Sequence, residues 1–344
     1  MLIPEEIIMV NVGVIGLGMM GLTHLDVYAK RKDVRAVAIS DKMPDRLSGK
    51  VRAAGNVEGQ AQGAFDLSQA RKYPEGMDLI RDPDVQVVDV CLPTPMHVEY
   101  ALAVLSAGKH LLVEKPLART YADASRLADA AEKATPISMI AMCMRFWPGW
   151  SWLKEAASGG PHGRVLSATF RRVAQHPGGA FYSNGTLCGG AVLDLHIHDT
   201  DFINWIFGRP RAVSTAGYSK ITAELDHVVT RYHYDNIPLV EAEGSWSMAE
   251  GFGFNMSYTI NFERATAVYD LAAKDKLMLY EPGKPARAVE LNPEMGYALE
   301  IGYFMECIKE GRRPSLVTLR DGAEAIRIVE AEVQSARSGK PVAL

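Results

Sequence analysis

The sequence has few cysteines, no long apolar run and little net charge. Its four cysteines, which form no CxxC pair, are Cys91, Cys143, Cys188 and Cys307. We therefore expect reduced thiols, with neither a disulfide framework nor a zinc site, and no bound metal. A net charge of −4 gives no electrostatic signature of binding to nucleic acid or to anionic membranes.

Membrane and export signals are absent from the sequence as well. No apolar run reaches the roughly 20 residues that a membrane-spanning helix needs. The opening segment MLIPEE is acidic and lacks the basic flank and apolar core of a signal peptide. These features predict a cytoplasmic protein. At 344 residues, with 48% hydrophobic residues, the chain is long enough for two domains that each have a core.

The N-terminal part alternates short apolar runs with helical patterns. The runs cover residues 10–16, 34–39, 85–92 and 110–113, and the helical patterns cover 21–28, 96–107 and 121–133. This alternation predicts a doubly wound parallel sheet, a Rossmann dinucleotide-binding domain over residues 1–135.

The rest of the chain has a different spacing of apolar residues. Long, partly alternating segments cover residues 164–173, 227–234, 239–248 and 255–270, with a hairpin turn expected at 235–238, and helical patterns cover 297–309 and 321–338. This pattern predicts a mostly antiparallel α+β domain over residues 136–344, which we assign to substrate binding and oligomerisation.

A glycine motif, GLGMMG at residues 16–21, lies between the first apolar run and the first helical pattern. Gly16 permits the turn, Gly18 lets backbone amides approach a pyrophosphate, and Gly21 allows close packing of helix on strand. Asp41 follows Gly21 by 20 residues and is expected to bind the adenosine ribose, which favours NAD over NADP. Lys42 leaves NADP open. The predicted cofactor residues of this segment are Gly16, Gly18, Met19, Met20, Gly21, Asp41 and Lys42.

Two further segments carry residues suited to moving a proton. Lys115 ends an apolar run, and Pro116 after it is a candidate for a cis peptide bond. Residues 192–207 are expected to form one helix, on which Asp194 and His198 would share a face. The alternatives are an exposed lysine and an ordinary surface ion pair.

A metal site is another interpretation of the second of these segments. His196, His198 and Asp199 would resemble metal ligands if the segment were a strand, but the helical pattern argues against this.

Aromatic and polar residues near the predicted domain boundary are candidates for substrate binding. Arg145 and Trp147 lie close to Trp150 and Trp152, and aromatic faces suit the C–H surfaces of sugars. Packing at a junction or interface explains the same residues equally well. His176 and Tyr182, in a glycine-containing loop, are further candidates. His24 and Cys91 are expected to be structural.

The chain resembles the Gfo/Idh/MocA (glucose–fructose oxidoreductase / inositol dehydrogenase / rhizopine catabolism) family over nearly its whole length. The matching segments are GLGMMG at 16–21, TPMH at 94–97, AGKHLLVEKPLA at 107–118 and GGAVLDLHIHDTDF at 189–202. The resemblance implies a Rossmann domain followed by an open-faced sheet domain, and a homodimer or homotetramer formed through those sheets. One departure is His196, which stands where relatives often carry glycine.

Site residues follow from the resemblance by position. Lys115, Asp194 and His198 look like the catalytic lysine and the D-x-x-x-H pair of the family. The residues that fall where the family lines the nicotinamide ribose are Pro93, Thr94, Pro95, His97, Glu114 and Lys115. His198 is the better general base, since the reference pKa of histidine is about 6.5, and an ammonium at Lys115 would stabilise a developing alkoxide. A relay of the proton through Lys115 stays open.

Together these features predict an NAD(P)-dependent oxidoreductase that transfers a hydride between a nicotinamide cofactor and a hydroxyl or carbonyl carbon of a sugar or polyol. One alternative is an NAD-dependent glycoside hydrolase that retains its cofactor. Others are a non-catalytic nucleotide-sensing regulator and, within the family, an imine or enone reductase.

Overall fold

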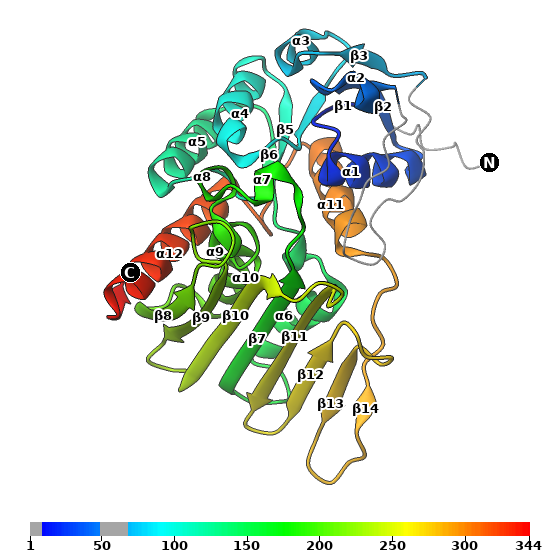
Figure 1. Cartoon of the computed structure of the whole chain (residues 1–344). Coiled ribbons are helices and arrows are strands. Elements are labelled where there is room, and N and C mark those ends of the chain that lie inside the picture. Colours follow the sequence, from blue (N-terminus) through cyan, green and yellow to red (C-terminus); the bar gives the residue numbers. More distant parts are fainter. Residues whose placement is uncertain (1–8, 49–67) are drawn as a thin grey trace, which may run out of the picture. The chain divides into compact units, whose positions relative to one another are not determined.

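The computed structural model describes residues 9–48 and 68–344, which form two compact units (Figure 1). The first unit contains the chain up to Leu117 together with Asp123–Ala141 and Tyr297–Arg320. The second contains Ala118–Ala122, Met142–Gly296 and Asp321–Leu344. The bounds of these units do not coincide with one boundary at residue 135, because Tyr297–Arg320 belongs to the first unit. The opening segment MLIPEE, on which the localisation prediction partly rests, lies outside the described residues.

The first unit is a Rossmann-type sheet of six parallel strands in the order β3-β2-β1-β4-β5-β6. The strands are β1 (Val10–Ile15), β2 (Val34–Ser40), β3 (Arg71–Tyr73), β4 (Val87–Val90), β5 (His110–Glu114) and β6 (Ser138–Ala141). The helical elements are α1 (Met19–Lys30), α2 (Pro44–Leu47), α3 (Gly76–Arg81), η1 (Thr94–Met96), α4 (His97–Ser106), α5 (Tyr121–Lys133) and α11 (Gly296–Glu310). The predicted doubly wound parallel fold is confirmed. Its strand order reverses between β1 and β4, where such sheets bind ligands.

The central strands of this sheet follow directly from the apolar runs. All four residues of β4, and four of the five in β5, are buried, as expected for strands covered on both faces. The elements that were not predicted include β3, α3 and β6. β3 has two exposed charged residues at the sheet edge, and α3 and β6 are too short to show a period of their own.

The second unit contains a nine-stranded, mostly antiparallel sheet in the order β14-β13-β12-β11-β7-β10-β9-β8-β15. Its strands are β7 (Val165–Gln175), β8 (Ala212–Tyr218), β9 (His227–His233), β10 (Leu239–Met248), β11 (Phe254–Phe262), β12 (Thr266–Asp270), β13 (Leu277–Tyr280), β14 (Arg287–Ala288) and β15 (Val342–Ala343). The helical elements are η2 (Cys143–Arg145), α6 (Pro148–Ala157), α7 (Gly179–Tyr182), α8 (Gly185–Cys188), α9 (Gly190–Asp194), α10 (Ile197–Phe207) and α12 (Leu319–Ser338). Figure 1 shows the sheet as the broad array of arrows from β8 to β14.

One face of this sheet is covered and the other is open. Along β9, Val228, Thr230 and Tyr232 are buried, whereas Val229 and Arg231 are exposed. Helices α9 and α10 contact the central strands β7, β9 and β10. The alternation of buried and exposed residues therefore shows that one face of the sheet is buried.

Two details of the second sheet bear on the sequence predictions. The hairpin predicted at 235–238 is confirmed, since β9 and β10 pair antiparallel on either side of it. The alternating segment at 255–270 forms two strands. The chain reverses at Glu263 and Arg264, where the Phe262 amide donates to the carbonyl of Ala265, so the segment is the β11–β12 hairpin.

Across the residues that the structure describes, no helix combines the length and the apolar character that a membrane span requires.

Candidate cofactor site and catalytic residues

The glycine motif forms the turn between β1 and α1. Gly16 has φ +93°, and a Cβ there would lie 2.4 Å from the carbonyl oxygen of Cys91. A Cβ on Gly21 would lie 1.8 Å from the carbonyl oxygen of Gly16. Gly18, by contrast, faces open space and is the N-cap residue of α1. Two glycines thus pack the turn, and the third leaves the helix N-terminus open to a phosphate.

No side chain of the turn competes for that phosphate position. The first turn of α1 has no acidic residue, and its N-cap makes no side-chain hydrogen bond. Met19 and Met20 are the first residues of the helix and are partly exposed. The positive end of the helix dipole therefore faces the position where a pyrophosphate would bind.

Asp41 lies just after β2 and links this turn to the following loop. Its Oδ2 accepts a hydrogen bond from the Leu17 amide at 2.8 Å and one from Arg46 Nη1 at 3.2 Å, and its Oδ1 accepts from the Met43 amide at 2.8 Å. Lys42 is exposed. Sequence reasoning missed Arg46, although its place five residues after Asp41 was a usable signal. Arg46 is the cation that faces the carboxylate, so it bears on the choice between NAD and NADP.

The loop after β4 contains the predicted nicotinamide-side residues. Pro93 precedes η1, which holds Thr94 and Pro95. His97 is 1% exposed, and its Nε2 and Nδ1 lie 2.6 Å and 2.7 Å from the carbonyl oxygens of Leu92 and Pro116. Burial lowers the pKa of His97, although both carbonyl contacts favour its protonation.

The structure shows that His97 links two loops, whereas its predicted contact with a cofactor stays a prediction. Its ring bridges two backbone segments, and the neutral imidazole has a single N–H to share between the two carbonyls. His97 therefore fixes the loop after β4 against the loop after β5. No signal in the sequence alone distinguishes these two roles.

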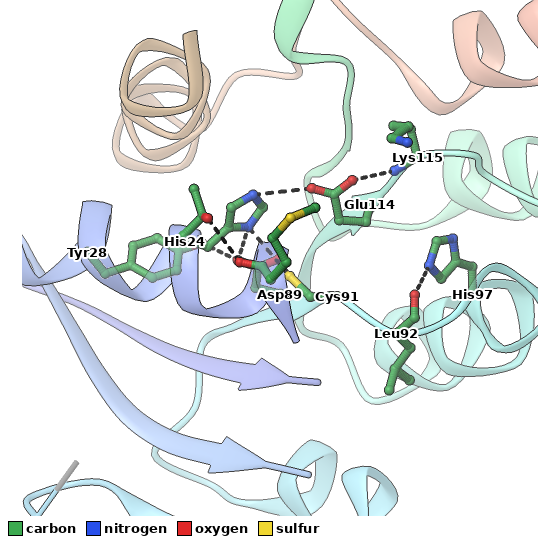
Figure 2. Close-up of polar contacts among 10 residues, drawn as sticks. His24, Tyr28, Asp89, Cys91, Leu92, His97, Glu114 and Lys115 are labelled. Carbon is green, nitrogen blue, oxygen red and sulfur yellow. Dashed lines mark hydrogen bonds and ion pairs between the residues drawn. The ribbon is translucent and has the colours of Figure 1, made fainter. Parts of the chain in front are cut away.

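The predicted catalytic lysine follows β5, at the carboxyl end of the parallel sheet. The Lys115–Pro116 peptide bond is cis, as the sequence suggested. Lys115 is half-buried, and its amide donates to Oε2 of Glu114 at 2.9 Å. Figure 2 shows Glu114, Lys115 and His97 around this turn.

The second unit places Asp194 and His198 on two helices, so the prediction of one helix over 192–207 is wrong. α9 ends at Asp194, and α10 begins at Ile197. The His196 amide donates to the carbonyl of Ala191, five residues back, at 2.8 Å, which interrupts the α-helical register. Asp194 and His198 are both half-buried and flank this break.

His196 lies at this break and contacts interior groups. It is fully buried over β10, where a Cβ on Gly244 would lie 2.5 Å from its Nδ1. Its Nε2 lies 3.2 Å from the Tyr232 hydroxyl. Asp199 is likewise buried and forms an ion pair with Arg172 at 2.7 Å. His196 and Asp199 thus contact interior groups, and the segment from Ile197 onward is helical.

The glycine pair before α9 also has a structural reason. Gly189 has φ +89°, and a Cβ there would lie 2.0 Å from Nη1 of Arg119. Gly190 has φ +73°, and a Cβ there would lie 2.7 Å from the carbonyl oxygen of Leu225. Arg119 also donates to the carbonyl of Gly185 at 3.2 Å. Sequence reasoning missed Arg119, although it lies only four residues after Lys115.

Arg145 and Trp147, predicted to bind substrate, are interior residues of the second unit. The Arg145 side chain is 1% exposed and makes two hydrogen bonds to Asp201, at 2.9 Å and 2.6 Å. Trp147 is 8% exposed, and a Cβ on Gly296 would lie 2.7 Å from its ring. Ion pairing and packing thus account for both side chains in this structure, and their predicted role in substrate binding stays a prediction.

His176 and Tyr182 organise their own loop. His176 Nδ1 accepts from the Gly178 amide at 3.1 Å, and Nε2 lies 3.2 Å from the carbonyl oxygen of Tyr182. The ring centroid of His176 lies 5.3 Å from that of Trp246, and the ring centroid of Tyr182 lies 6.1 Å from it. The imidazole nitrogens of His176 are thus engaged within the loop, and Tyr182, which is half-buried, stays a candidate.

Comparison with known proteins decides the family. Residues 10–142 match a family described as "Oxidoreductase family, NAD-binding Rossmann fold", and residues 163–344 match one described as "Oxidoreductase family, C-terminal alpha/beta domain". The chain belongs to the Gfo/Idh/MocA oxidoreductase family. The resemblance predicted from the sequence motifs is thereby confirmed.

Individual relatives are inositol and sugar dehydrogenases. Myo-inositol 2-dehydrogenase of Thermotoga maritima is 34% identical over 200 residues, an alignment that covers 58% of this chain and 55% of that protein. Scyllo-inositol 2-dehydrogenase (NAD(+)) of Bacillus subtilis is 24% identical over 352 residues, covering 97% and 96%. A levoglucosan dehydrogenase solved with NADH and levoglucosan has the same fold, with a TM-score of 0.85, 22% identity, and coverage of 97% and 99%.

Proposed function

We propose that the protein is an NAD-dependent dehydrogenase that oxidises a secondary hydroxyl of a cyclic polyol or sugar. The observation that carries this proposal is the turn between β1 and α1. Gly18 leaves the N-terminus of α1 accessible there, and the Asp41 carboxylate accepts a hydrogen bond from the Leu17 amide. The site has backbone donors for a pyrophosphate and a carboxylate beside them for a ribose. The inositol and levoglucosan dehydrogenases among the relatives support the substrate class.

The chemistry requires one proton to leave the hydroxyl as the hydride leaves its carbon. Nicotinamide, when bound, accepts the hydride. We assign His198 as the base that takes the hydroxyl proton, Asp194 as the residue that orients it, and Lys115 as the ammonium that stabilises the developing alkoxide. Lys115 belongs to the first unit, and the other two residues belong to the second.

Replacement of Lys115 tests this assignment. Lys115→Ala and Lys115→Met should lower kcat by about 100-fold or more, because the alkoxide loses its cation. The affinity for NADH, followed by fluorescence of the bound nucleotide, should stay unchanged. The matched control is Lys109→Met, since Lys109 binds the carbonyls of Asp82 and Val85. Full turnover in both Lys115 variants would remove Lys115 from the mechanism.

The preference for NAD is part of the proposal. The carboxylate of Asp41, which is 8% exposed, would repel a 2′-phosphate, and this argues for NAD. Arg46 beside it is the residue that would accept NADP if the carboxylate were removed.

Oligomeric state and location complete the proposal. We infer a homodimer or homotetramer through the open face of the second sheet, where Val229 is 42% exposed beside polar neighbours. The four cysteines, all of them free, support a reducing compartment such as the cytoplasm. The molecular mass in solution tests the oligomeric state. An increase in free thiol when the purified protein is reduced would contradict the reducing compartment.

A further inference from the structure

A fully buried histidine lies between two carboxylates in the first unit. His24, on α1, is 0% exposed. Its Nδ1 lies 2.8 Å from Oδ2 of Asp89 on β4, and its Nε2 lies 3.3 Å from Oε1 of Glu114 on β5. Figure 2 shows the imidazole ring between the two acids, with Glu114 reaching on toward Lys115.

Asp89 is held in place by other donors. The Tyr28 hydroxyl donates to Oδ2 of Asp89 at 2.8 Å, and the Cys91 thiol donates to Oδ1 at 3.4 Å. Burial raises the pKa of the Cys91 thiol, so this group is a neutral donor. With its carboxylate fixed by three partners, Asp89 determines the orientation of the His24 ring.

The neighbours of His24 favour its protonation. Burial lowers the pKa of His24, but the charge of Asp89 and its hydrogen bond act in the opposite direction, and the pKa rises well above the usual value. His24, Asp89 and Cys91 offer three atoms within 4.8 Å of one another that could ligate a metal. The same atoms already serve one another as donors and acceptors, so we interpret the group as a hydrogen-bonded cluster.

Glu114 transmits this arrangement to Lys115. One oxygen of its carboxylate faces His24, and the other accepts the Lys115 amide at 2.9 Å. Glu114 is 5% exposed, so its carboxyl oxygens are satisfied mainly by the protein and not by water. The series Asp89–His24–Glu114 thus ends on the backbone of Lys115.

We propose that His24 is a positioning residue for Lys115: its ring, oriented by Asp89, places Nε2 against the Glu114 carboxylate, and this carboxylate fixes the Lys115 backbone. The inference rests on the proposed function, in which Lys115 stabilises the alkoxide. His24 affects the chemical step through Glu114 and leaves cofactor and substrate binding alone.

A double-mutant cycle tests the proposal. His24→Phe keeps the ring volume and removes both ring nitrogens, and should lower kcat by about 10- to 100-fold while KM and NADH affinity stay unchanged. Glu114→Gln should lower kcat similarly. If His24 acts through Glu114, adding His24→Phe to Glu114→Gln causes no further loss. Additive losses would overturn the proposal.

The control for this cycle is Thr23→Val, the neighbouring buried position on α1. In the part of the chain that the structure describes, the Thr23 hydroxyl donates to the carbonyl of Met19 in its own helix, and its replacement should leave kcat unchanged. An equal loss in Thr23→Val and His24→Phe would show a general effect of perturbing α1, which contradicts the proposal.

NMR spectroscopy tests the contact between His24 and Glu114 without relying on turnover. In ¹⁵N-histidine-labelled protein, Glu114→Gln should shift the imidazole signals of His24, because Nε2 of His24 lies 3.3 Å from the Glu114 carboxylate. His24 signals that are identical in the unmodified protein and in Glu114→Gln would overturn the proposal even if His24→Phe fails to fold. Lack of turnover in the unmodified enzyme, with the signal shift present, would contradict the proposed function and leave the coupling of His24 to Glu114 standing.

Discussion

Glu332, a fully buried carboxyl group on α12, makes the stability of the protein depend on pH. It is 0% exposed, and its Oε1 accepts a hydrogen bond from the Thr200 hydroxyl at 3.0 Å. Burial raises the pKa of Glu332 to about 8, and hydrogen bonds from Tyr232 and Thr200 oppose the rise only in part. His196 lies 3.7 Å away, but burial, followed by the charge of Arg172, lowers its pKa to about 3. His196 is therefore neutral and offers no positive charge to a Glu332 anion.

The sign and size of the effect follow from linkage. An unfolded glutamate loses its proton near its ordinary pKa of 4.5, whereas folded Glu332 keeps it until about pH 8. The folded state thus binds more protons between these pH values. The stabilisation is fully present below pH 4.5 and is lost as pH rises through 8. The loss over this window is about 5 kcal/mol, at about 1.4 kcal/mol for each unit by which the folded and unfolded pKa differ.

Glu332→Gln removes the titrating group and keeps an acceptor for Thr200. We expect urea unfolding to show that the unmodified protein loses several kcal/mol of stability between pH 5 and pH 8.5, whereas Glu332→Gln loses much less. Glu330→Gln is the matched control, because Glu330 is an exposed glutamate on the same helix that accepts the Tyr121 amide. It should retain the pH dependence of the unmodified protein. Equal pH dependence in Glu332→Gln and the unmodified protein would refute this account.

Three substitutions test other contacts. Asp201→Ala deprives Arg145 of its main buried partner and should cost about 3–5 kcal/mol of stability in urea unfolding; a normal midpoint would contradict a structural role for the pair. Gly189→Ala should lower the melting temperature more than Gly208→Ala, because both positions have positive φ but only Gly189 is crowded, and equal losses would contradict the crowding. Asp41→Ser should raise kcat/KM with NADP relative to kcat/KM with NAD by about 10- to 100-fold, which corresponds to the free energy of one charge-assisted hydrogen bond. An unchanged preference would show that Asp41 does not select the cofactor.

Local sequence was enough to predict the parts of the site that are built from neighbouring residues. The strand, glycine turn and helix at residues 10–30 depend on contacts within one βα unit, so the pattern alone identified them. The break between Asp194 and His198 could not be read in the same way. It accompanies the burial of His196 over Gly244, a contact between segments far apart in the sequence.

The same limit applies to side chains that look suited to substrate. Arg145 pairs with Asp201, 56 residues away, and no local pattern indicates that partner. An arginine beside tryptophans predicts a binding site and a buried ion pair equally well. Only the fold distinguishes the two interpretations.

The most direct test of the central claim is NADH fluorescence on mixing the purified protein and NAD with a panel of inositols, anhydrosugars and aldoses. The account predicts formation of NADH with at least one cyclic polyol or sugar, and its loss in Lys115→Ala. Confirmed binding of NAD with no NADH formed from any member of the panel would contradict the assignment as a dehydrogenase of this substrate class.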